Sequence, residues 1–202
     1  MPARTRGLIV GILLAAGAGS RFGGGKLVAR LADGRGVAAT TCARLLPAVD
    51  LVVAVVPAQP GTLEDELRAA GAEVVRCGAE HPGIGVSIAC GVAATADAAG
   101  WLVALGDMPL VPTAQHRLVA DALRSGAAIA APVCRGRRGH PVGFAARFGD
   151  ELRALAGDEG ARALLARHRD ALVELAVDND ASWLDIDTPS DLAAVNHRLG
   201  SH

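Results

Sequence analysis

A short aliphatic run that ends in a glycine-rich loop is the feature that most constrains how this sequence folds. Residues 8–14 read Leu-Ile-Val-Gly-Ile-Leu-Leu and carry no charge, which is typical of a strand covered on both faces in a parallel sheet. Five glycines follow between residues 17 and 25. Glycine tolerates positive φ and lets the backbone approach a ligand closely, so the N–H groups of such a loop can face an anion. The side chains of Arg21 and Lys26 add positive charge, and the pattern therefore predicts a phosphate-binding loop after a buried strand.

The spacing of this loop matches neither of two common phosphate-binding motifs. A Walker loop requires G-x-x-x-x-G-K-[ST], but Ser20 stands where its first glycine belongs and Leu27 where its hydroxyl belongs. A Rossmann fingerprint requires G-x-G-x-x-G, and Phe22 occupies the place of its third glycine. The loop is therefore of another type.

Composition limits the partners that the chain is expected to have. The net charge is -1, from 20 basic and 21 acidic residues, which gives no electrostatic reason to expect nucleic acid or a membrane surface as a partner. Aromatic residues make up only 2%, so base stacking on aromatic side chains is disfavoured. The four cysteines form no C-x-x-C pair, which favours reduced thiols over a zinc site or a disulfide framework. A cytoplasmic protein with a small charged substrate is the expectation.

The first half of the chain alternates predicted strands and helices in a βαβαβ order. Apolar runs and stop signals predict a helix over residues 36–46, a strand over 51–56, a helix over 62–70 and a strand over 72–76. This order predicts a single Rossmann-like α/β domain over residues 1–202, with a doubly wound, mostly parallel sheet flanked by helices. Ligands bind such sheets at the carboxyl ends of the strands, where the glycine-rich loop is expected.

The second half continues the alternation. The predicted elements are an Ala-rich helix that begins just after Ser87, a strand over 101–105, a helix over 112–123, a strand over 127–133, a basic hairpin over 135–144, a helix from 157 to about 168 and an edge strand over 171–177. The last helix is predicted to begin with a capping arrangement. Thr188 would be its N-cap, Pro189 its first residue and Asp191 its third position.

The loop from Leu14 to Lys26 reads L-A-A-G-x-G-x-R-F-G-x-x-K and resembles the signature loop of the MobA-like nucleotidyltransferases. Within that superfamily it is most similar to the molybdenum cofactor cytidylyltransferases. The resemblance implies that the loop wraps an NTP, with Arg21 and Lys26 in catalytic roles at the phosphates. The implied nucleotide-binding residues of the loop are Leu14, Ala15, Ala16, Gly17, Gly19 and Lys26. A secretory signal is the alternative for this apolar N-terminal stretch, and the family spacing of Arg21 and Lys26 favours a retained strand.

Residues 83–92 are similar to the family's G-M-G-x-S-[LI]-A-x-G-V segment, with isoleucine in place of its methionine. This resemblance implies that Gly85 and Ser87 help hold the base and ribose, whereas the residues alone also permit an ordinary capped helix start. The segment G-D-M-P around Asp107 resembles the one by which the family supplies a carboxylate to Mg²⁺. Asp107 is therefore implied as a catalytic, nucleotide-binding and metal-binding residue, and a turn cap is the alternative.

The segment D-I-D-T-P-x-D-L near the C-terminus also resembles a family element. It implies that Asp187 is the second metal-facing carboxylate, with Asp185 as the alternative. Magnesium prefers one or two protein carboxylates, with substrate phosphates and waters as its other ligands. The resemblance therefore implies one Mg²⁺ bound between Asp107, Asp187 and a triphosphate.

The basic turn is similar to the family's G-x-x-G-H-P-V segment, which lies on the acceptor side of the cleft. The implied acceptor-binding residues are Arg137, Arg138, Gly139, His140 and Pro141. Guanidinium groups bind phosphate in a bidentate geometry, which fits the phosphate of a pterin monophosphate. The alternatives are a solvated turn and a neutral His140 bonded to the backbone. Residues 157–165, which resemble G-D-x-G-A-R, are either acceptor-side support or a plain capped helix.

The resemblance implies a nucleotidyltransferase that moves a nucleoside monophosphate from an NTP to the phosphate of molybdopterin or molybdenum cofactor. The Ala15-Ala16-Gly17 form of the loop favours CTP over GTP, and a molybdoenzyme or chaperone is a further expected partner. Residues 27–34 depart from the family pattern, which leaves the acceptor open. The alternatives are a transferase for a sugar-phosphate or alcohol-phosphate acceptor, and a non-catalytic module that binds nucleotide or delivers cofactor.

Overall fold

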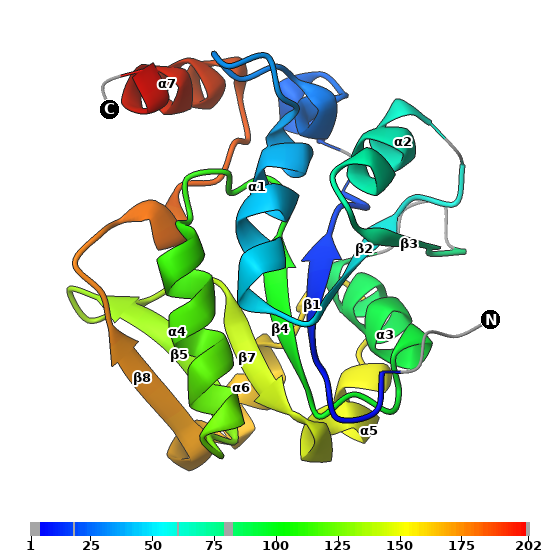
Figure 1. Ribbon diagram of the computed structural model, residues 1–202, viewed down its shortest axis with the longest axis vertical. Helices are drawn as coiled ribbons and strands as arrows, with labels where there is room; N and C mark the ends of the chain where they lie inside the picture. Colours follow the sequence, from blue (N-terminus) through cyan, green and yellow to red (C-terminus); the bar gives the residue numbers. More distant parts are fainter. Residues whose placement is uncertain (1–4, 18, 60, 79–82, 201–202) are drawn as a thin grey trace.

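The sheet at the centre of the molecule has eight strands. The structure is a computed structural model that describes residues 5–17, 19–59, 61–78 and 83–200. The strands are β1 (Ile9–Leu14), β2 (Leu51–Val56), β3 (Glu73–Arg76), β4 (Gly100–Leu105), β5 (Ile129–Cys134), β6 (Arg137–Arg138), β7 (Val142–Ala145) and β8 (Leu172–Ala176). Their order is β3-β2-β1-β4-β7-β5-β6, and β8 pairs with β5 (Figure 1).

Most neighbouring strands run parallel, as the βαβαβ order predicts. β1 lies between β2 and β4 and is parallel to both, β3 is parallel to β2, and β8 is parallel to β5. Two strands run the other way. β7 lies antiparallel between β4 and β5, and β6 forms the predicted hairpin with β5. The doubly wound α/β fold is confirmed.

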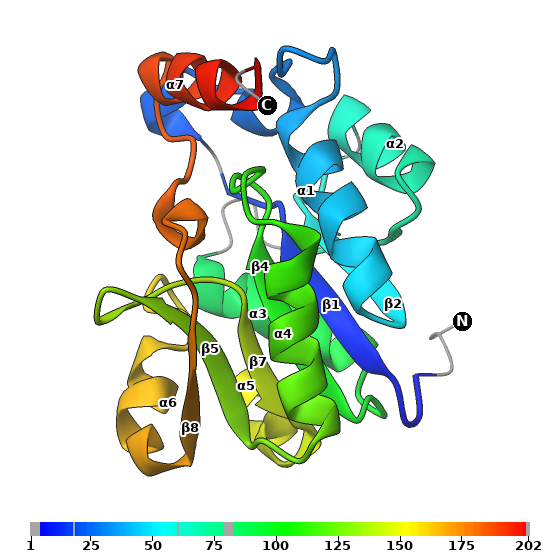
Figure 2. The ribbon, with the colours of Figure 1, turned by 60° about the vertical axis from the view of Figure 1, so that its left-hand side comes forward.

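Helices cover both faces of this sheet (Figure 2). On one face, α1 (Val37–Leu45), α2 (Thr62–Ala69) and α4 (Thr113–Arg124) pack Leu45, Leu67 and Val119 against strand residues such as Leu13. On the other face, α3 (Ile84–Ala94), α5 (Gly149–Arg153) and α6 (Arg162–Arg167) meet the opposite side chains of the same strands, including Ile12. Every residue of β1 is therefore buried, which explains its uncharged sequence.

The last helix, α7 (Pro189–Gly200), packs apart from these two cores. A third cluster joins its Val195 to Ile186, Leu31 and Val37, so the helix covers the segment that follows the glycine-rich loop. The predicted capping arrangement is confirmed, because the Thr188 N–H donates to Asp191 Oδ2 at 2.7 Å and the Asp191 N–H donates to Thr188 Oγ1 at 3.3 Å. Within the described ranges, no helix combines the length and apolarity needed to cross a membrane.

Candidate functional site

A chain of ion pairs joins the glycine-rich loop to two aspartates at the carboxyl end of the sheet. The Lys26 ammonium lies 2.6 Å from Asp107 Oδ2 and 3.0 Å from Asp187 Oδ1. Arg21 contacts the other oxygen of the Asp187 carboxylate at 2.5 Å. The Lys26 side chain is only 10% exposed, whereas that of Arg21 is 76% exposed. The predicted catalytic and metal-binding residues thus lie side by side, although 161 positions separate Lys26 from Asp187.

The backbone explains why these side chains meet. β1 and β4 are hydrogen-bonded neighbours whose carboxyl ends carry the loop and Asp107, and the Gly106 N–H donates to the Leu14 carbonyl at 2.9 Å. A side chain at Gly106 would lie only 2.8 Å from that carbonyl oxygen, so this close approach requires glycine. The Ile186 N–H then donates to the Asp107 carbonyl at 3.0 Å, which places Asp187 next to the same strand end.

Lys26 begins a 3-10 turn (Lys26–Val28) whose preceding residue, Gly25, has a φ of 67°. This left-handed conformation favours glycine and turns the chain so that the Lys26 side chain faces the aspartates. Burial alone would lower the pKa of Lys26, but the hydrogen bonds and charges of Asp107 and Asp187 outweigh it and raise the pKa above its usual value. Lys26 is therefore a fixed positive charge at neutral pH.

Three carboxylates gather beside this lysine. Oxygens of Asp107, Asp185 and Asp187 lie within 4.8 Å of one another. Partial burial, together with the charges of the other two aspartates, raises the pKa of Asp185. Asp107 Oδ1 is buried and has no hydrogen-bond partner among the described residues, so it is left to a ligand. Hard oxygen donors in this arrangement make a candidate site for a divalent cation.

A cavity of about 400 Å³ opens beside Lys26 and Asp107 and collects most of the predicted nucleotide-binding residues. Its lining includes Leu14, Ala16, Gly17, Gly19, Lys26, Ser87 and Asp107. Gly85 lies just outside it, where its N–H donates to the Gly157 carbonyl at 3.0 Å and holds the start of α3. The structure therefore brings the loop, the first turns of α3 and the end of β4 around one space.

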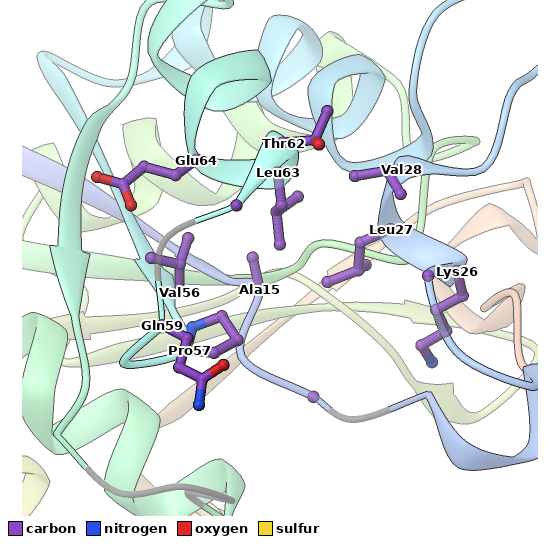
Figure 3. A pocket seen from close by; sticks show the side chains of 13 residues that line it. Ala15, Lys26, Leu27, Val28, Val56, Pro57, Gln59, Thr62, Leu63 and Glu64 are labelled. Carbon is purple, nitrogen blue, oxygen red and sulfur yellow. The ribbon is translucent and has the colours of Figure 1, made fainter.

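A second cavity, of about 290 Å³, lies on the α2 side of the loop and was not anticipated from the sequence (Figure 3). Ala15 faces this cavity, with Leu27 and Val28, while Val56 and Pro57 line it from the end of β2. Figure 3 shows Lys26 and Glu64 at opposite ends of it. The sequence held one signal for this cavity. The proline directly after the predicted strand 51–56 marks its carboxyl end, and that end lies beside the carboxyl end of β1, where ligands bind in such sheets.

Only some of the predicted acceptor residues line one cavity. Arg138, Gly139 and His140 line a third cavity of about 250 Å³, together with Glu159 and Arg162. Arg137 points elsewhere, and its guanidinium lies 5.0 Å from the centre of the Trp183 ring. Pro141 is likewise not among the lining residues of this cavity.

His140 lies at the edge of the third cavity. Gln115 Nε2 donates to the His140 carbonyl at 2.7 Å, and burial lowers the pKa of the His140 imidazole to about 4. The imidazole is therefore neutral at physiological pH. Ile84 lines both this cavity and the 400 Å³ cavity, so the two spaces share a wall.

The family model described as the MobA-like NTP transferase domain matches residues 11–172. The chain belongs to the MobA-like NTP transferases. The match includes the glycine-rich loop, Asp107 and the residues that line the third cavity, and it ends before Asp185 and Asp187. Comparison with curated proteins gave no sequence match.

Solved structures agree with this assignment. Rv0371c from Mycobacterium tuberculosis is 29% identical, with 94% of this chain and 98% of that chain covered and a TM-score of 0.79. A structure of the same protein as a complex with manganese is 28% identical, with the same coverage and a TM-score of 0.71. A nucleotidyl transferase from Methanothermobacter is 25% identical, with 96% and 99% covered and a TM-score of 0.80.

A molybdopterin-guanine dinucleotide biosynthesis protein A from Archaeoglobus fulgidus is similar in fold alone, at 19% identity. The chains are covered to 96% and 100%, with a TM-score of 0.69. The family model confirms the family of this MobA-like chain, and the solved structures confirm its α/β fold. The base of the nucleotide, the acceptor and the roles of single residues remain predictions.

Proposed function

We propose that this MobA-like domain transfers a nucleoside monophosphate from an NTP, with CTP preferred, to the phosphate of molybdopterin or molybdenum cofactor. An oxygen of the acceptor phosphate attacks the α-phosphorus, the bond between the α- and β-phosphates breaks, and pyrophosphate leaves. The observation that carries the proposal is the contact of Lys26 with both Asp107 and Asp187 beside the 400 Å³ cavity. Charge-bearing groups for phosphates and for a cation thus converge on one point.

The carboxylates of Asp107 and Asp187, with Asp185 beside them, would hold Mg²⁺. The unpartnered Asp107 Oδ1 and the spacing of the three carboxylates fit a hard cation. The manganese complex of Rv0371c supports a divalent cation in a related protein. When bound, the cation withdraws charge from the phosphate oxygens and makes the phosphorus more open to attack.

The protein's own residues would act by position and charge. Lys26 and Arg21, with the N–H groups of the glycine-rich loop, bind the phosphates and neutralise the charge that develops on the leaving pyrophosphate. No covalent nucleophile on the protein is needed. Burial raises the pKa of Cys42 to about 11 and, together with the nearby Cys77, that of Cys90 to about 12, so these thiols stay protonated.

The acceptor would occupy the third cavity, which is called the acceptor cavity below. Arg138 offers a guanidinium there for the acceptor phosphate, and Arg162 is a second arginine in its lining. Because Ile84 lines both this cavity and the 400 Å³ cavity, an acceptor phosphate bound beside Ile84 would lie next to the triphosphate. A neutral His140 would hydrogen-bond to the acceptor and orient it, since a transfer of this kind depends more on positioning than on a strong base.

The proposal is tested by pyrophosphate release from purified protein with Mg²⁺, each of the four NTPs, and molybdopterin or its molybdenum form. The expected result is fastest release with CTP and a pterin acceptor. Release only with a sugar-phosphate or alcohol-phosphate acceptor would replace the acceptor proposed here. NTP binding without turnover on any acceptor would favour a delivery module.

A further inference from the structure

The Lys26 ammonium bonds to the same carboxylates that a divalent cation would need. It contacts one oxygen of Asp107 and one oxygen of Asp187, at 2.6 and 3.0 Å. The apolar stem of Lys26 packs closely against the loop. A Cβ atom added at Gly19 would lie only 3.1 Å from Lys26 Cγ. The Lys26 and Asp107 side chains are only 10% and 18% exposed, so their ion pair is largely sheltered from water, whereas the Asp187 side chain is 35% exposed.

A cation bound to Asp107 and Asp187 would lie within a few ångströms of this ammonium group. Two positive charges at such a distance repel each other, most strongly where water is excluded. The ammonium and the cation therefore compete for the same oxygens. For both to take part in one reaction, Lys26 has to move, and the phosphates of a nucleotide are the anions to which its flexible side chain can turn.

Charge counting shows that the departure of Lys26 from the aspartates and the binding of a cation favour each other. The carboxylates of Asp107, Asp185 and Asp187 together carry three negative charges when ionised, and Lys26 and Arg21 offset two of them. If Lys26 turns away, two negative charges are left uncompensated, and one dication neutralises both. Each event therefore makes the other more favourable, and such coupling is reciprocal.

We propose that Lys26 is an internal competitor for the metal, so that the protein takes up its divalent cation together with the nucleotide, as a metal–nucleotide chelate. This inference rests on the proposed function, because it takes the triphosphate to be the ligand that draws Lys26 away. Arg21 offers a matched comparison. It bonds to the outer oxygen of Asp187 and is largely exposed, so it competes much less.

The test measures Mn²⁺ binding to the full chain by electron paramagnetic resonance, without nucleotide. Lys26→Met keeps the apolar stem and removes the charge, and it is expected to bind Mn²⁺ at least tenfold more tightly than wild type. Lys26→Arg keeps the charge and should bind as weakly as wild type. Arg21→Gln should differ from wild type by less than threefold. If circular dichroism shows that Lys26→Met is unfolded, Lys26→Gln serves as a second uncharged variant.

A second measurement uses the wild-type protein alone. CTP binding followed by calorimetry should be at least tenfold tighter with Mn²⁺ than with EDTA. Equal CTP affinity in both conditions, or uncharged Lys26 variants that bind Mn²⁺ no better than wild type, would overturn the inference. Absence of CTP binding in any condition would instead count against the proposed function, and the measurement without nucleotide would still decide whether Lys26 competes with the cation.

Discussion

Arg137 and Arg138 are adjacent in the chain but have different surroundings, because successive side chains of a strand point to opposite faces. Both belong to the two-residue strand β6, which continues the tight hairpin from β5. Arg138 lines the acceptor cavity, whereas Arg137 lies over the ring of Trp183. The basic composition of the turn therefore overstates the charge available to an acceptor.

This difference predicts different effects of two neighbouring substitutions. Arg138→Ala should raise the KM for the acceptor by about tenfold, since a charge-assisted contact to phosphate contributes about 1.5–3 kcal/mol. Arg137→Ala should leave that KM within about twofold of wild type and lower the free energy of unfolding by at most about 1 kcal/mol, the usual size of an exposed cation–π contact. Steady-state kinetics and urea unfolding measure both quantities. Equal rises in KM would show that Arg137 also reaches the acceptor.

Among the elements, α3 is closely constrained by its neighbours on two sides. Its first turn approaches the segment that precedes α6, and an added side chain at Gly85 would lie 2.7 Å from the Ala156 carbonyl oxygen. Further along the same helix, an added side chain at Gly91 would lie 2.7 Å from Ile12 Cγ2 in the core. The two glycines thus have equally close neighbours, but only Gly85 lies between Ile84 and Ser87, which line the 400 Å³ cavity.

We expect Gly85→Ala and Gly91→Ala to destabilise the protein similarly, by about 1–3 kcal/mol, because each overpacks a close contact. Only Gly85→Ala should also impair nucleotide binding, with a KM for the NTP raised severalfold, since it shifts the turn that carries Ser87. Thermal unfolding and steady-state kinetics on the matched pair separate the effects. A KM that rises as much in Gly91→Ala would mean that it reflects general loosening of the fold.

Most elements could be predicted from the sequence because they depend on local patterns. The strands predicted at residues 8–14 and 51–56 agree with β1 and β2 to within one residue, and the N-terminal cap of α7 has the hydrogen bonds that its sequence implies. The position of β7 between β4 and β5 could not be predicted, because it depends on pairing between distant strands. The short helix α5 was missed because five residues carry little periodicity.

For the molecule as a whole, two buried histidines predict how stability depends on pH. His116 is fully buried, and neither of its ring nitrogens has a hydrogen-bond partner among the described residues. Burial, helped by the charge of Arg44, lowers the pKa of His116 from 6.5 to about 4. As pH falls below 6.5, the unfolded chain therefore takes up a proton that the folded protein does not, and stability decreases.

The loss should be absent above about pH 7 and should reach roughly 2 kcal/mol for His116 at pH 5. His140, with a pKa lowered by burial to a similar value, should add a comparable amount. His116→Leu should remove its share of the pH dependence, whatever constant offset the substitution brings. Urea unfolding at pH 8 and pH 5 measures the loss of unfolding free energy. A His116→Leu protein that loses as much stability as wild type between these two pH values would contradict the prediction.

The site as a whole was only partly accessible from the sequence. Glycine, lysine and aspartate at family spacing identified the residues that meet around the 400 Å³ cavity, because the carboxyl ends of parallel strands lie together. The ion pairs of Lys26 with two distant aspartates, and the stacking of Arg137 on Trp183, depend on side-chain geometry that spacing does not encode. The same holds for the cavity on the α2 side of the loop.

Asp107 and Asp187 are proposed to hold a cation against the α-phosphate, and the turnover number of their asparagine variants measures this role. Asparagine keeps the volume and most hydrogen-bonding capacity but removes the charge that a hard dication requires. Asp107→Asn and Asp187→Asn should each lower kcat by about 100-fold or more, because several kcal/mol of transition-state stabilisation is lost. Each should change the free energy of unfolding by no more than about 1 kcal/mol, because asparagine can still accept a hydrogen bond from Lys26 and the loss of one of three clustered carboxylates relieves their repulsion. A folded Asp107→Asn enzyme that turns over at the wild-type rate would contradict the account.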